Sequence, residues 1–147
     1  MSWKSMLMAT AVAAAEPDLV DEDVEVIEIT DVEARMIRMM IRDQLAAFRA
    51  GDAERAWRFA SEGIRSTFVE PERLLSLIRQ KYAPLTNLKQ LVFGEWSITP
   101  DGVGIALEVL DQQYRRHRIT YLVVRESDGW KVNGAVSADP EAVAEAA

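Results

Sequence analysis

The residues with the clearest capacity for chemistry are a histidine, an aspartate and three tyrosines in the second half of the chain. His117 is the only histidine in the sequence, and Asp111 precedes it by six positions. An aspartate and a histidine within hydrogen-bond reach can move protons, and tyrosine hydroxyls can act as donors beside them. The tyrosines are Tyr82, Tyr114 and Tyr121. This set of residue types could support proton-transfer chemistry.

Asp111 and His117 also have plain structural interpretations. On an extended strand His117 shares a face with Tyr121 and would point toward the interior, whereas its arginine-rich neighbourhood at residues 115–118 favours solvent. Asp111 stands between two predicted strands, where aspartate commonly helps the chain to turn. We therefore assign no catalytic residue and keep His117 and Asp111 as candidates.

Two of these arginines, Arg116 and Arg118, fall together on the opposite face of that strand. Such a pair could hold a carboxylate or a phosphate group. We favour the alternatives that the two arginines are simply solvated or that they protect a sheet edge from pairing with another sheet.

A second group of residues could line a ligand-binding cavity. Arg65 follows a predicted helix end and could either clamp that corner through carbonyl groups or a carboxylate, which we favour, or meet an anionic ligand. Aromatic side chains usually belong to the core, but they also line apolar cavities. The candidates for ligand binding are Arg65, Trp57, Phe68, Tyr82, Tyr121 and Trp130.

Composition excludes several classes of function. The chain has no cysteine and one histidine, so thiolate chemistry is absent and a zinc site with four Cys or His ligands is not expected. We find no glycine-rich phosphate loop and no serine nucleophile motif, and we predict no metal and no cofactor. Nine of the 24 acidic residues lie in Glu16–Glu33, which has no basic residue. The remainder is nearly neutral, so we expect no nucleic-acid partner.

The first 15 residues have the order of a secretory signal. Lys4 precedes an apolar run of ten residues that ends in the small residues Ala13–Ala15. Two interpretations stay open: a cleaved signal peptide of a periplasmic or secreted protein, or an ordinary N-terminal arm of a cytoplasmic one. The run is too short to cross a bilayer, and we expect no membrane span.

The remaining chain divides into an acidic linker, one domain and a tail. Residues 16–30 are predicted to be a disordered acidic linker, residues 31–138 a single domain, and residues 139–147 a C-terminal tail. The acidic stretch could fold back on the arginine-rich first helix as an inhibitory strap, although we favour a solubilising leader.

Three helices are predicted in the first half of the domain. The first has Asp31 as its N-cap, and its apolar residues recur at helical spacing between positions 37 and 48. The second follows the break at Ala50–Asp52 and ends at Ser61–Gly63.

The third helix begins at Pro71, because proline is tolerated in the first turn. Between the second and the third helix, Ile64–Val69 is predicted to be extended or irregular.

The second half predicts four antiparallel strands joined in sequence order. Alternating apolar residues and turn residues place the strands at residues 88–98, 103–109, 114–125 and 130–136. Gly94 is a predicted bulge, and Asp128-Gly129 makes the last hairpin turn. The fold class is therefore α+β, with three N-terminal helices packed on one face of a curved antiparallel four-stranded sheet.

Several short motifs resemble those of a bacterial family known as domain of unknown function 4864, over roughly Val32 to Val136. The motifs are Gln44-Leu45-Ala46-Ala47-Phe48, Asp52, Ala56-Trp57, Phe59-Ala60-Ser61, Gly63-Ile64-Arg65, Phe68, Pro71-Glu72, Phe93-Gly94 and Asp128-Gly129-Trp130-Lys131-Val132-Asn133-Gly134.

The arrangement of elements also resembles the nuclear-transport-factor-two-like superfamily. That resemblance implies helices in the concave face of a bent sheet, often around a cone-shaped pocket. It implies no activity, because the superfamily contains enzymes, binding proteins and assembly modules.

We interpret the chain as a non-catalytic domain that binds a small apolar or weakly anionic molecule in such a pocket, or serves as an interaction module. One alternative is an isomerase- or hydrolase-like enzyme that uses the same pocket. The other is a structural module that forms a homodimer through the exposed face of its sheet.

Overall fold

The computed structural model describes residues 29–137. The predicted signal peptide, residues 16–28 of the predicted linker and the C-terminal tail lie outside this range. The described chain forms helices packed against a four-stranded antiparallel sheet with the strand order β1-β2-β3-β4, which confirms the α+β class and the meander topology. None of its helices is long and apolar enough to cross a membrane.

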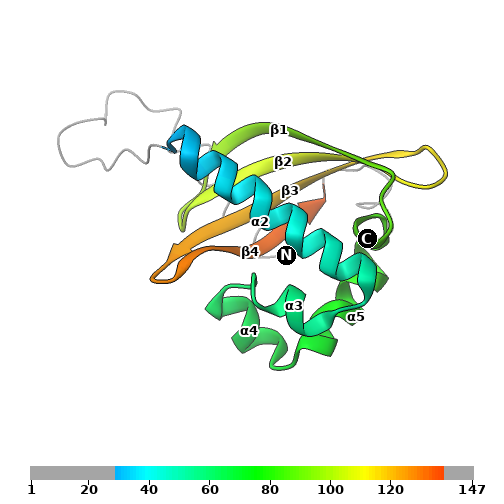
Figure 1. The fold of residues 1–147 in the computed structure, drawn as a ribbon, viewed down its shortest axis with the longest axis horizontal. Coiled ribbons are helices and arrows are strands. Elements are labelled where there is room, and N and C mark those ends of the chain that lie inside the picture. Colours follow the sequence, from blue (N-terminus) through cyan, green and yellow to red (C-terminus); the bar gives the residue numbers. More distant parts are fainter. Residues whose placement is uncertain (1–28, 138–147) are drawn as a thin grey trace.

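Helix α2, Asp31–Ala50, is the longest helix of the described chain and crosses in front of the sheet in Figure 1. Its N-cap is Thr30 rather than Asp31, because the Thr30 hydroxyl accepts from the Glu33 amide and the Glu33 carboxylate accepts from the Thr30 amide. This reciprocal pair satisfies two otherwise unpaired donors. Gly51 ends the helix in the left-handed conformation at φ 71°.

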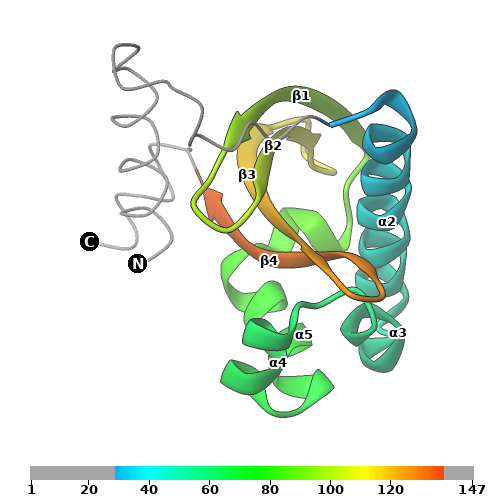
Figure 2. The ribbon, with the colours of Figure 1, turned by 90° about the vertical axis from the view of Figure 1, so that its left-hand side faces the viewer.

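The shorter helices lie below α2 and close one end of the sheet (Figure 2). They are α3, Ala53–Trp57; α4, Glu62–Phe68; α5, Pro71–Lys81; and the 3-10 helix η2, Ala83–Thr86. Pro71 occupies the first turn of α5 as predicted.

The prediction of an extended or irregular segment at residues 64–69 was wrong, because α4 covers most of it. Ser61 caps α4 by accepting from the Ile64 amide at 3.1 Å, and its hydroxyl donates to Asn133 on the sheet at 2.6 Å. Gly63 is therefore part of a new helix and does not end the preceding one. The described chain has four α-helices where three were predicted.

The strands are β1, Gln90–Ile98; β2, Val103–Leu110; β3, Arg116–Glu126; and β4, Gly129–Ser137. The register between β1 and β2 shifts between Phe93 and Trp96, where the bulge was predicted. The turn at residues 126–129 joins β3 and β4 as expected. The sheet curves strongly around the face that carries α2 (Figure 2).

Strand β2 is more deeply buried than its alternating pattern predicted. Gly104 and Ala106 were expected on an exposed face, but both are buried, as are the apolar residues that alternate with them. The proposed role of Arg116 and Arg118 in protecting an edge was also wrong. Both lie on β3, which pairs with β2 on one side and with β4 on the other.

The core lies between the helices and one face of the sheet. Ile37 and Ile41 of α2 are fully buried there, as are Ile105, Leu107 and Val123 of the sheet. Burial of these apolar side chains orients α2 and leaves its arginine-bearing side uncovered.

Candidate functional site

An open groove of about 690 Å³ runs between the first half of α2 and the ends of β1 and β2. We call it the arginine groove. Its lining includes Arg35, Arg38 and Arg42 from α2, Trp96 and Ile98 from β1, and Val103 from β2. Its volume falls within the range of about 300–1,000 Å³ that is typical of small-molecule sites.

The three arginines share one side of α2 because they are spaced by three and four residues. The guanidinium carbon of Arg38 lies 5.6 Å from the centre of the Trp96 ring, and that of Arg42 lies 5.2 Å from the centre of the Phe93 ring. At these distances a cation is attracted to the ring face and held in place over it.

The arginines of the groove have no anionic partner within residues 29–137. The ion pairs of the described chain involve other basic residues. None of Arg35, Arg38 and Arg42 lies within 4.0 Å of an acidic oxygen there. Asp31 lines the groove at the start of α2 without pairing with them. Three neighbouring positive charges therefore face a space that an anion could occupy.

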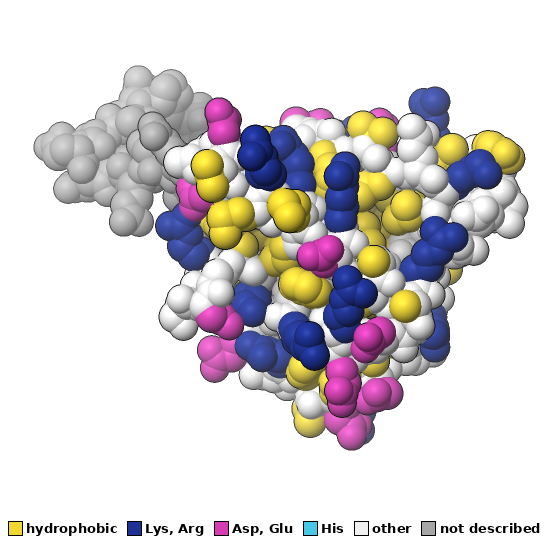
Figure 3. Space-filling model, viewed as in Figure 1, with side chains coloured by type: hydrophobic (Ala, Val, Ile, Leu, Met, Phe, Trp, Pro, Cys, Tyr) yellow, Lys and Arg dark blue, Asp and Glu magenta, His cyan; other side chains and the backbone are white. Residues whose placement is uncertain are grey.

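Exposed apolar side chains lie in the groove itself, at Met39 and Ile98, and elsewhere on α2. Val32, Met36 and Met39 on α2 and Ile98 on β1 are each more than half exposed. Figure 3 shows hydrophobic and basic side chains next to one another along α2. The surface therefore combines exposed apolar area with positive charge, and exposed apolar patches often mark binding sites.

A second, smaller hollow of about 40 Å³ lies between the helices and the β3–β4 side of the sheet. We call it the inner chamber. Its lining includes Gln44 of α2, Phe68 of α4, Tyr82, Tyr121 of β3, and Gly134 and Ala135 of β4. A space of this size is far smaller than a drug-sized ligand requires.

Gln44 brings a polar group to the inner chamber. Its side chain is 2% exposed, and its Nε2 donates to the Ala56 carbonyl at 3.2 Å. Its Oε1 is buried and has no hydrogen-bond partner among the described residues. Exchanging the two amide atoms would place Oε1 against a carbonyl oxygen, so the hydrogen bond fixes the orientation.

Two tyrosines line the inner chamber and remain protonated across the physiological range. Tyr82 donates its hydroxyl hydrogen to the Ala135 carbonyl at 3.1 Å, and burial raises its pKa. Burial, with a smaller contribution from Tyr82, raises the pKa of Tyr121 further. Both phenols are therefore neutral and cannot act as anionic bases near pH 7.

The structure brings together three of the six residues predicted to bind a ligand. Phe68, Tyr82 and Tyr121 line the inner chamber, whereas Arg65, Trp57 and Trp130 line neither hollow.

The three predicted ligand-binding residues that line neither hollow make contacts elsewhere in the domain. Arg65 lies inside α4, and its guanidinium is 4.0 Å from the carboxylate of Glu126 at the end of β3. The Trp130 ring lies 4.8 Å from the guanidinium carbon of Arg125, and Trp57 packs against the core.

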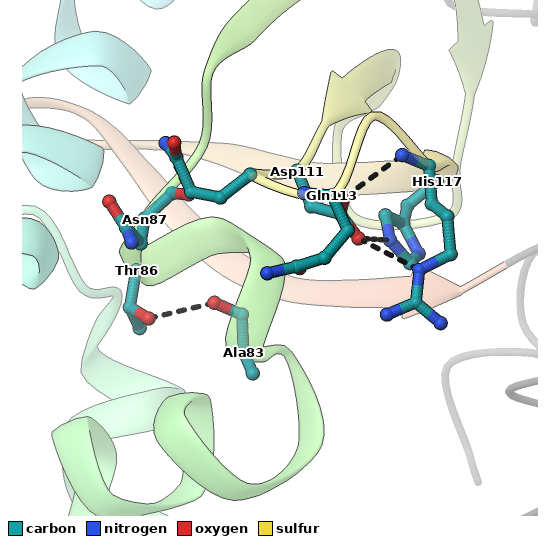
Figure 4. A network of polar contacts seen from close by, with 8 residues as sticks. Ala83, Thr86, Asn87, Asp111, Gln113 and His117 are labelled. Carbon is teal, nitrogen blue, oxygen red and sulfur yellow. Dashed lines mark hydrogen bonds and ion pairs between the residues drawn. The ribbon is translucent and has the colours of Figure 1, made fainter.

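Asp111 and His117 lie close together beside η2 and the β2–β3 loop (Figure 4). His117 Nε2 is 2.8 Å from Asp111 Oδ2. The other oxygen of Asp111 accepts from the Gln113 and Arg115 amides at 2.8 Å and 2.9 Å. The hydrogen bond with His117, together with these amides, lowers the pKa of Asp111.

Both carboxylate oxygens of Asp111 accept hydrogen bonds or approach the imidazole within the protein, which gives Asp111 a structural role that needs no substrate. Its carboxylate holds the 111–115 turn and orients the imidazole, as aspartates do in both structural and catalytic pairs. Neither the arginine groove nor the inner chamber includes Asp111 or His117 in its lining. Within residues 29–137 no three His, Asp or Glu side chains are grouped so as to hold a metal ion.

The arginines of the groove are not among the site residues predicted from the sequence. Their spacing in the sequence was visible, and it indicates one side of a helix. The aromatic rings beneath them come from β1, and only the folded chain shows that β1 passes along that side of α2.

The fold and the two hollows define the class of protein: a small α+β domain with cavities between its helices and one face of a curved sheet. Within that class, a family model described as "Domain of unknown function (DUF4864)" matches residues 30–144, and the chain belongs to this family. Comparisons with curated proteins and with solved structures found no match.

Proposed function

We propose that this protein is a non-catalytic domain that binds a small molecule in the arginine groove. The ligand combines an anionic group, such as a carboxylate or a sulfonate, with an apolar body. The observation that carries the proposal is the set of three arginines without anionic partners in the described chain, two of them over aromatic rings, along a groove of ligand size.

The apolar body would lie on Trp96, Ile98 and Val103, where its contact removes exposed apolar surface from water. The anionic group would lie against Arg38 and its neighbours. Because Arg38 is already held over Trp96, less side-chain freedom is lost when the ligand binds. The groove therefore offers both contacts to one molecule.

We also propose that the domain adopts the nuclear-transport-factor-two-like arrangement. The strongly curved sheet, with its helices on one face, supports this placement (Figure 2). In that arrangement the arginine groove and the inner chamber lie on the same face of the sheet, on opposite sides of α2.

A fluorescent probe tests the proposed site. Anilinonaphthalene sulfonate has an aromatic body and one negative charge, and its fluorescence rises in apolar sites. We expect saturable binding, with an affinity that Arg38→Gln lowers roughly three- to tenfold, since one cation is lost beside the sulfonate. Arg116→Gln is the matched control, because Arg116 is an exposed arginine of β3 outside the groove. Equal affinity in the two variants would reject the groove as the site.

A proton-transfer enzyme is the second candidate, and the 2.8 Å contact between Asp111 and His117 is the observation that favours it. His117→Ala separates the two candidates. Under the binding proposal the variant keeps its affinity for the probe. An enzyme that depends on His117 would lose turnover of its substrate while the fold is retained. Homodimer formation through the sheet stays a separate prediction.

A further inference from the structure

We propose that the acidic segment 16–28 binds in the arginine groove of its own molecule and competes there with the ligand. The inference rests on the proposed function only for that competition. The docking itself depends on the charge, position and apolar character of the groove.

Charge is the first reason for this choice of occupant. Residues 16–28 contain seven acidic residues and no basic residue: Glu16, Asp18, Asp21, Glu22, Asp23, Glu25 and Glu28. The groove presents Arg35, Arg38 and Arg42, which have no acidic partner within the described chain. Opposite charges concentrated on two parts of one chain attract each other at low ionic strength.

Position is the second reason. The segment leads directly into Ile29, which itself lines the arginine groove. Arg35 and Arg42 are seven residues apart, so they span about 10 Å along the axis of α2. Thirteen extended residues reach about 40 Å, which is ample to follow the three arginines. A short tether also gives the segment an effective concentration on the order of millimolar at the groove.

Apolar character is the third reason. In the segment, Asp23 and Glu25 alternate with Val24 and Val26. An extended chain directs alternate side chains to opposite sides, so these carboxylates and valines would face different walls. The groove has both kinds of wall, because arginines lie on α2 and apolar side chains lie on β1 and β2.

A spin label provides the test, and the chain has no native cysteine that would compete for it. The full chain with Glu22→Cys carries one nitroxide, and the indole N–H signals of the tryptophans are observed by NMR. At about 0.01 M salt we expect the Trp96 signal to lose most of its intensity. The signals of Trp57 and Trp130, which lie outside the groove, serve as internal controls.

Two conditions must restore the Trp96 signal. One is 1 M salt, where the Debye length falls to about 3 Å. The other is the combined substitution Arg35→Gln, Arg38→Gln and Arg42→Gln, which removes the cations. A Trp96 signal that keeps its full intensity at low salt would overturn the proposal. So would a comparable loss of intensity in isotope-labelled chains that carry no nitroxide and are mixed with nitroxide-labelled chains, because the occupant would then be a second copy.

Competition is measured separately with anilinonaphthalene sulfonate. The variant Asp21→Asn, Asp23→Asn and Glu25→Gln should bind the probe roughly three- to tenfold more tightly, as expected from the loss of exposed ion pairs in a tethered competitor. The matched control, Asp139→Asn, Glu141→Gln and Glu145→Gln, removes three charges from the other end of the chain. Equal affinity in the two variants would overturn competition.

The two experiments distinguish the two proposals. Loss of the Trp96 signal in a protein that binds no probe would reject the proposed ligand site and leave self-docking in place. Probe binding that depends on Arg38, with an unaffected Trp96 signal, would reject self-docking and leave the ligand site in place.

Discussion

Replacement of Gln44 by methionine should leave the domain as stable as the native protein or make it more stable. Gln44 is 2% exposed and is among the lining residues of the inner chamber, and its buried Oε1 has no hydrogen-bond partner in the described chain. Methionine has nearly the same length and fills the same space without a polar atom. Few buried polar residues are expected to be replaced without cost.

The size of the change in the free energy of unfolding follows from two opposing contributions of the Gln44 side chain. An unsatisfied buried acceptor costs about 1–3 kcal/mol, and the hydrogen bond from Nε2 to the Ala56 carbonyl contributes about 1 kcal/mol. That carbonyl would keep a partner, because the Phe59 amide also donates to it at 3.2 Å. The net change in the free energy of unfolding is therefore a gain of about 0–2 kcal/mol.

Urea unfolding with a constant m-value measures this change. Gln80→Met is the matched control, because Gln80 lies on the exposed side of α5 and its replacement should alter stability by less than about 0.5 kcal/mol. A loss of more than about 1 kcal/mol in Gln44→Met would refute the reasoning, since it would mean that Oε1 has a bound partner in solution.

Three other substitutions test the account of the fold. Val69 has φ 70° and ψ −40°, and the Glu70 amide donates to the Phe68 carbonyl across it at 2.7 Å, so Val69 is the central residue of a strained γ-turn. Because glycine adopts this conformation without strain, Val69→Gly should raise the free energy of unfolding in urea by about 1 kcal/mol. Gly102→Ala places a Cβ against the Val123 carbonyl and should destabilise by about 2 kcal/mol or more, and a smaller loss would show that the turn can move. Asp111→Asn removes a carboxylate whose pKa is lowered in the folded protein, so the ionised group stabilises the fold above its unfolded pKa of about 4. The native protein should therefore melt at a higher temperature than the variant at pH 7, and this difference should disappear as the pH falls through the folded pKa. A difference in melting temperature that is independent of pH would contradict this last prediction.

The sheet could be predicted because its signals are local. Alternating apolar residues and the Asp128-Gly129 turn indicate strands and a hairpin without knowledge of distant contacts. Helix α4 could not be predicted in this way. Its N-cap, Ser61, is fixed by Asn133 of β4, and the Ser61 amide donates to the Val132 carbonyl at 2.8 Å. These contacts join parts of the chain that are far apart in sequence.

The candidate site was less accessible to sequence reasoning than the fold. The shared face of His117 and Tyr121 follows from the two-residue period of a strand, yet only His117 approaches Asp111, whereas Tyr121 lines the inner chamber. The spacing of Arg35, Arg38 and Arg42 predicts one side of a helix. That this side faces Trp96 depends on the curvature of the sheet and on the position of α2, which no local pattern contains.

An NMR titration with decanoate tests the central claim most directly, because this molecule joins a carboxylate to an apolar chain and reports its position residue by residue. We expect saturable chemical-shift changes at Arg38, Trp96 and Ile98 around the arginine groove, with little change at Tyr121 and Ala135 in the inner chamber. Changes centred on Tyr121 and Ala135, with Trp96 unaffected, would contradict it and place the ligand in the inner chamber.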